Sequence, residues 1–153
     1  MDQSLGAGHG AHRLTLDDQR VVFRITKTTP TKIGQFVTLW KRPKPDEFPS
    51  AAGNKPAALH TDDRIGFVVV HVHDDSHSGQ SIFNRSILVD KGTMATGSKK
   101  GKTAFRIYPP WTKPVADEAI KSQRWQNVYF VADNENEVSK LDKVRKLFNK
   151  TKN

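Results

Sequence analysis

The most apolar run in the chain covers residues 65–73, where the sequence IGFVVVHVH contains three consecutive valines and two alternate histidines. Valine, isoleucine and phenylalanine favour extended backbone, so this run predicts the central strand of a sheet. Shorter runs of similar composition predict strands at 14–16, 21–26, 36–41, 80–83 and 103–108. Asp17 and Asp18 supply the first predicted turn.

Helical patterns dominate the second half of the chain. Asn84 is a suitable N-cap for a helix over 85–91 that Gly92 ends. Pro114 is expected to open a second helix with an apolar face, and a third is expected over about 135–149. The apolar residues assigned to these two helices are Ile120, Trp125, Val128 and Val131, then Val138, Leu141, Val144 and Phe148. Strands first and helices last predict an α+β fold with a mixed, mainly antiparallel central sheet flanked by helices.

A chain of 153 residues is long enough for one domain with a real core. We divide it into a flexible, Gly-rich lead-in at 1–12, an α+β domain at 13–132 and a basic C-terminal helix at 133–153. Residues 43–64 hold four of the eight prolines and predict a long surface loop.

Several protein classes are excluded by composition. The chain has no cysteine, so it has neither disulfides nor Cys-ligated metal. No apolar run approaches the roughly twenty residues that cross a bilayer, and the N-terminus lacks the pattern of a signal peptide. We therefore expect a cytoplasmic protein with no membrane association.

Positive charge is concentrated in two stretches. Residues 19–45 and 91–116 hold thirteen of the 25 lysines and arginines and no acid, whereas the rest of the chain sums to −4 against a total of +9. Such a field, with aromatic rings inside it, suits the phosphates and bases of a nucleic acid. The candidate binding residues are Arg24, Lys27, Lys32, Gln35, Lys41, Arg42, Lys99, Lys100, Lys102, Arg106, Trp111 and Lys113.

Two expectations concern how these residues are displayed. If the strands that carry Arg24 and Arg106 share a sheet, the two arginines lie on one surface. Trp111 follows Pro109 and Pro110 in a connector, so we expect its ring to be exposed for base stacking, whereas Trp40 and Trp125 are expected in the core.

Three separated blocks carry a family resemblance. They are KTTPTKIGQFVTLWKR at 27–42, GKTAFRIYPPW at 101–111 and SQRWQ at 122–126. With these blocks the chain resembles the MepB-like family of small bacterial proteins. The resemblance implies a core similar to the PD-(D/E)XK nuclease superfamily, and nucleic-acid binding rather than a settled reaction.

The chemistry of that superfamily needs two carboxylates for Mg²⁺ and an Asp/Glu-x-Lys motif. No lysine in the chain has Asp, Glu or Gln two residues before it. A divergent site built from Asp63, His71 and Asp75 stays open, and Mg²⁺ would be required only there. His71 and His73 share one strand face and could ligate a metal with Asp75, with His60 and His77 nearby. We favour half-exposed histidines, no metal and no cofactor.

The sequence thus predicts a nucleic-acid-binding protein with a nuclease-like fold and no competent PD-(D/E)XK site. RNA or single-stranded DNA is the expected partner, because stacking rings and loops outnumber any recognition helix. Two alternatives are a divergent metal-dependent nuclease or phosphodiesterase, and a protein-interaction module that recruits an acidic partner through the C-terminal helix.

Overall fold

A computed structural model describes residues 12–16, 19–41 and 56–149, and for 12–16 the backbone alone. It confirms the α+β class and the mixed, mainly antiparallel central sheet. The strands are β1 (His12–Leu16), β2 (Gln19–Ile25), β3 (Lys27–Thr28), β4 (Gln35–Thr38), β5 (Trp40–Lys41), β6 (Ala57–Ala58), β7 (Ile65–His73), β8 (Ser78–Asn84), β9 (Ala104–Ile107) and β10 (Phe130–Ala132). The helices are the 3-10 turn η2 (Thr61–Asp63), then α1 (Arg85–Asp90), α2 (Asp117–Asn127) and α3 (Glu137–Asn149).

The large sheet has five strands in the order β1-β2-β7-β8-β10. Only β2 and β7 run parallel, and the other three pairs are antiparallel. The predicted central strand is confirmed as β7, with the predicted bounds. The predicted helix after Asn84 is also confirmed, because the Asn84 side chain accepts a hydrogen bond from the Ile87 N–H at 2.8 Å.

A second, smaller sheet has the order β3-β4-β9, all antiparallel. The chain passes from the large sheet to the small one at Thr26. Its N–H donates to the His71 carbonyl of β7 at 3.0 Å, and its buried hydroxyl donates to the Gln35 side chain of β4 at 3.1 Å. Thr26 therefore joins the two sheets.

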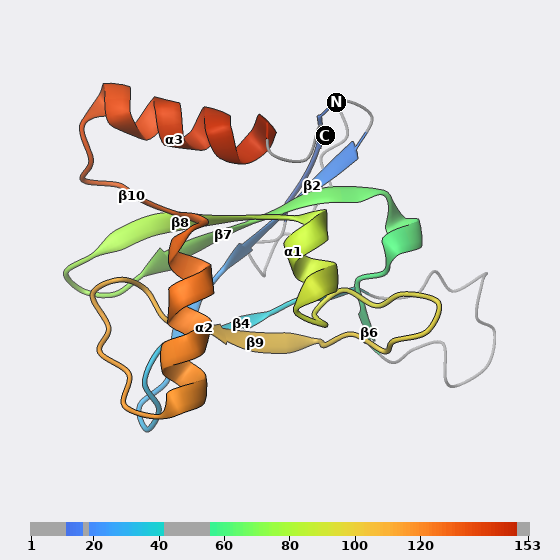
Figure 1. Ribbon diagram of the computed structural model, residues 1–153, viewed down its shortest axis with the longest axis horizontal. Coiled ribbons are helices and arrows are strands. Elements are labelled where there is room, and N and C mark those ends of the chain that lie inside the picture. Colours follow the sequence, from blue (N-terminus) through green and yellow to red (C-terminus); the bar gives the residue numbers. More distant parts are fainter. Residues whose placement is uncertain (1–11, 17–18, 42–55, 150–153) are drawn as a thin grey trace.

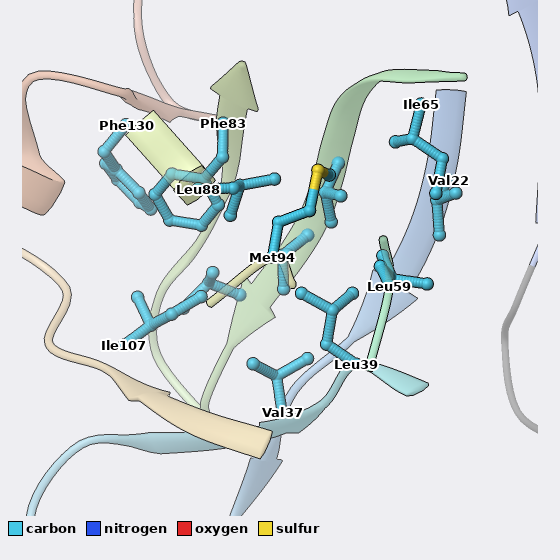
Figure 2. Close-up of a cluster of buried hydrophobic side chains, with 13 residues drawn as sticks. Val22, Val37, Leu39, Leu59, Ile65, Phe83, Leu88, Met94, Ile107 and Phe130 are labelled. Carbon is cyan, nitrogen blue, oxygen red and sulfur yellow. The ribbon is translucent and has the colours of Figure 1, made fainter. Parts of the chain in front are cut away.

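The main core lies between the two sheets. Valines at alternate positions of β7, from Val68 to Val72, meet Val37 of β4 and Ile107 of β9. Figure 2 shows this cluster, with Leu88 of α1 and Met94 closing it beside Phe83. Strands β4 and β9 of the small sheet thus turn one face to the core, and their other face lies at the surface.

Helix α3 covers the opposite face of the large sheet (Figure 1), while α1, α2 and the small sheet lie on the first face. Phe67 and Val69 of β7 pack there with Val144, Leu147 and Phe148 of α3, and the rings of Phe67 and Phe148 are 4.6 Å apart. Of the four residues predicted for the apolar face of α3, Val144 and Phe148 pack as expected, whereas Val138 and Leu141 are exposed. None of the described helices has the length and apolar character to span a bilayer.

Helix α2 is shorter than the sequence predicted. It begins at Asp117, three residues after Pro114, and ends at Asn127. Val131 is not on its face but in strand β10, which pairs with β8. The error arises because Val128 and Val131 fit helical spacing, although Val131 is completely buried in the large sheet.

Two glutamines of α2 hold the segment that follows β9. The Gln126 side chain, 3% exposed, accepts from the Tyr108 N–H at 2.7 Å and donates to the Arg106 carbonyl at 2.9 Å. It thus pairs with the edge of β9 as a neighbouring strand would. Gln123 donates to the carbonyls of Pro109 and Thr112 at 2.8 and 2.7 Å.

Replacing Leu147 should reveal how much α3 contributes to the fold. Leu147→Ala empties a buried site and should lower the free energy of unfolding by about 2–4 kcal/mol. Leu141→Ala is the matched control, because Leu141 lies on the same helix but is 57% exposed, and its cost should stay within about 0.5 kcal/mol. Urea unfolding followed by circular dichroism measures both, and equal costs would contradict the packing of α3.

Gln126→Ala should lower the free energy of unfolding by about 1–3 kcal/mol, because it leaves two backbone groups of β9 without partners. Gln126→Glu should not restore stability, since a carboxylate accepts from Tyr108 but cannot donate to the Arg106 carbonyl. Glu118→Ala, at an exposed position of α2, is the control in the same urea titration. If Gln126→Ala unfolds like the wild type, the edge pairing has no energetic role.

Candidate functional site

The outer face of the small sheet brings two predicted residues together. Phe36 of β4 is paired with Lys27 of β3 on one side and with Arg106 of β9 on the other. Paired residues of neighbouring strands project to the same face, and this face is opposite the one that buries Gln35, Val37 and Ile107. Lys27, Phe36 and Arg106 therefore form a row across the sheet, on the side away from the core.

Arg106 also fixes the turn between β3 and β4. Its guanidinium donates to the Thr29 hydroxyl at 2.7 Å and to the carbonyls of Ile33 and Gly34 at 3.2 and 3.3 Å. The guanidinium carbon lies 5.7 Å from the centre of the Phe36 ring, within cation–π distance. Arg106 is thus a positioning residue for the turn that carries the exposed Lys32.

Gly34 is required in that turn. Its φ is 90°, and a Cβ there would lie 2.9 Å from the Tyr108 ring and 3.1 Å from the Ile107 carbonyl. Only glycine accepts this backbone without strain. We call the set Lys27, Lys32, Phe36 and Arg106 the basic face.

Three further lysines lie at the other end of β9, in a loop over residues 96–102 that we call the lysine loop. The Thr96 hydroxyl accepts from the N–H groups of Ser98 and Lys99 at 3.2 and 3.1 Å, and the Lys102 N–H donates to the Thr93 carbonyl at 2.8 Å. The loop is therefore folded by its own hydrogen bonds. The side chains of Lys99, Lys100 and Lys102 are exposed.

The remaining predicted binding residues are elsewhere. Gln35 is 5% exposed and is bonded to Thr26, so it does not reach the surface. Lys41 forms an ion pair with Asp63 at 2.5 Å. Lys113 is exposed in the connector after Trp111, and Arg42 is outside the described residues.

Arg24 does not share a sheet with Arg106, so the condition for placing the two arginines on one surface is not met. Arg24 belongs to β2 in the large sheet, whereas Arg106 belongs to β9 in the small one. Its guanidinium donates to the Phe23 and Trp40 carbonyls at 2.9 and 3.1 Å. Arg24 therefore connects β2 to β5.

The tryptophans also differ from expectation. Trp40 is half-buried, whereas Trp125 packs against the main core as predicted. Trp111 is half-buried, stacked on the His77 ring at 4.7 Å and edge-on to Phe130 at 5.6 Å. The Trp111 ring, expected to be exposed for base stacking, is therefore partly covered by protein side chains.

Trp111 lines an open pocket of about 740 Å³ together with Asp74, Asp75 and Asp133. The Asp74 carboxylate accepts hydrogen bonds from the Ser76 and His77 N–H groups, which lower its pKa below the usual value. This end of the molecule is acidic and disfavours a phosphate. Trp111 is accordingly separate from the basic face in electrostatic character.

Asp63, His71 and Asp75 do not form one site. Asp63 precedes β7 and Asp75 follows it, and a nine-residue strand separates its ends by about 30 Å. Asp63 pairs with Lys41 and caps η2 through the His60 N–H, whereas His71 bonds to Gln80 and stacks on His73 at 5.3 Å. Among the described residues, no three metal-ligating side chains converge.

Charge alone does not identify Phe36, Gln123 and Gln126 as residues of the site. Phe36 carried a signal, because successive residues of a strand point to opposite faces, and two adjacent apolar residues, Phe36 and Val37, cannot both face the core. The glutamines carried none, since a polar residue on a helix is normally solvated. Their role depends on the tertiary arrangement of α2 and β9.

Comparison with known proteins gives one family and one solved structure. The MepB-like family model matches residues 4–132. A solved structure described as the crystal structure of MepB superposes with a TM-score of 0.76 and 30% sequence identity, over 88% of this chain and 87% of that one. No curated protein matches.

The structure also explains why the three blocks of the sequence occur together. The first two blocks contain the strands β3, β4 and β9 of the small sheet and the turn between β3 and β4, and 122–126 supplies the glutamines that hold β9 and the segment after it. The family match spans all three blocks and well over half of the chain. The chain belongs to the MepB-like family.

Proposed function

We propose that this protein binds nucleic acid through the basic face and the lysine loop, and that it does so in the cytoplasm. The observation that carries the proposal is the lack of acidic partners around these lysines. Lys27, Lys32, Lys99, Lys100, Lys102 and Lys113 all come from the acid-free stretches. Within the described part of the chain, none of the six has a carboxylate at ion-pair distance.

The lysines of α3 provide a contrast. Lys140, Lys143 and Lys146 pair with Asp133, Glu135 and Asp142 at 3.7, 2.6 and 3.1 Å. Their charge is compensated locally, and the Lys143 hydrogen bond lowers the pKa of Glu135. This arrangement disfavours the alternative in which the C-terminal helix recruits an acidic partner.

The acidic pocket around Trp111 also supports nucleic-acid binding at the basic face and the lysine loop, because it disfavours a polyanion at Trp111. Asp74, Asp75 and Asp133 line this pocket beside Trp111; Asp133 pairs with Lys140, and of the six uncompensated lysines Lys113 alone comes from the connector that holds Trp111. A polyanion approaching the molecule is therefore repelled at one end and attracted along β9. Charge separation of this kind orients a nucleic acid before any specific contact forms.

Binding should weaken steeply with salt, because lysines that neutralise phosphates release counterions. For about four contacts to a single strand, log K should fall with log salt with a slope of about −3. Fluorescence anisotropy with labelled single-stranded RNA, single-stranded DNA and duplex DNA across a salt series measures this slope.

Lys32→Ala and the double variant Lys99→Ala/Lys100→Ala should each weaken binding about threefold to tenfold and reduce the slope by about one per lysine. Lys146→Ala is the matched control, because it removes the same charge from a helix whose lysines are already paired. Binding of no oligonucleotide at low salt would refute the proposal. An equal loss of affinity in Lys146→Ala would show that binding depends on net charge and not on the basic face or the lysine loop.

A further inference from the structure

We infer that Phe36 is a stacking platform for an unpaired base, so that the ligand of the basic face is a single-stranded nucleic acid. This inference rests on the proposed function and adds to it the residue that stacks on the base. Phosphates explain the lysines, but they do not explain a phenylalanine between two cations on the outer face of a sheet.

The position of Phe36 is not one that the core requires. Its neighbours Gln35 and Val37 are buried beneath the small sheet, whereas Phe36 is half-buried on the other side. Two of its neighbours on that side, Thr38 and Ala104, have small side chains and are paired with each other across β4 and β9. The small side chains of Thr38 and Ala104 beside the ring leave room for a flat base to approach it.

The cations flank the ring in a way that suits a nucleotide. Lys27 and Arg106 are the direct cross-strand neighbours of Phe36, and such neighbours have Cβ atoms about 5 Å apart. Arg106 is held by Thr29, Ile33 and Gly34, and its guanidinium lies over the Phe36 ring at 5.7 Å, so a base would stack on the other face of the ring. Lys27 is exposed, with no described carboxylate at ion-pair distance, and can follow a phosphate.

The ligand class follows from this geometry. A ring on a strand can stack only on a base whose face is accessible, and duplex bases are already stacked on each other. An unpaired base can lie on Phe36 while its phosphates contact Lys27 and the lysine loop. Because every base has a flat face, the contact favours single strands without specifying sequence.

The test compares an intact single strand with a strand of the same length and charge that lacks bases. Stacking of one base is expected to be worth roughly a 5- to 150-fold difference in affinity. The wild-type protein should therefore prefer the intact strand by a factor in that range. Phe36→Leu should abolish the preference and leave affinity for the abasic strand and for duplex DNA unchanged.

Two further variants separate stacking from folding and from charge. Phe36→Tyr keeps the ring and should retain the preference, whereas Lys27→Ala should weaken intact and abasic strands by the same factor. Thermal unfolding of each variant shows whether Phe36→Leu is folded; if it is not, Phe36→Tyr and Phe36→Trp still test whether the preference follows the aromatic ring.

These measurements separate a failure of nucleic-acid binding from a failure of Phe36 stacking. If the wild type binds none of the oligonucleotides, the proposed function fails. If it binds intact and abasic strands equally, or if Phe36→Leu weakens both by the same factor, binding stands and the stacking role of Phe36 is overturned.

Discussion

The pairing of the Gln126 side chain with β9 is the interaction on which the candidate site depends. Among the described strands, β9 pairs with β4 alone, and the Gln126 amide occupies the other side by bonding to both Arg106 and Tyr108. Arg106 in turn fixes the turn that presents Lys32. One buried amide on α2 thus determines the position of a loop on the far side of the sheet.

Separation of charge is the second organising feature. The acidic side chains around Trp111 and the lysines of the basic face and the lysine loop come from different segments, although Trp111 follows Arg106 by only five residues in the chain. The Pro109–Pro110 break, held by Gln123, redirects the chain between them. Under the proposed function, this arrangement would orient a polyanion as it binds.

The fold was largely predictable from the sequence, because β7, β8 and α1 carry strong local signals, such as the valine run and the Asn84 cap. The two failures have different causes: Val131 fits helical spacing but lies in strand β10, whereas Val138 lies on α3 as predicted but on the face that does not meet the sheet. Charge correctly pointed to Lys27, Lys32 and the lysine loop as exposed residues. Charge could not show that Lys41 is paired with Asp63 or that Arg24 is bonded to the Trp40 carbonyl of β5. It also could not show that Gln35 is buried. These outcomes depend on contacts between residues distant in sequence.

The most direct test of the account is to map the ligand on the protein by NMR. A short single-stranded oligonucleotide is added to the ¹⁵N-labelled chain at low salt, and amide shifts are followed. The account predicts the largest changes at Lys27, Lys32, Phe36 and Arg106 and across residues 97–102. Changes concentrated at His77 and Trp111, or along α3, would contradict it.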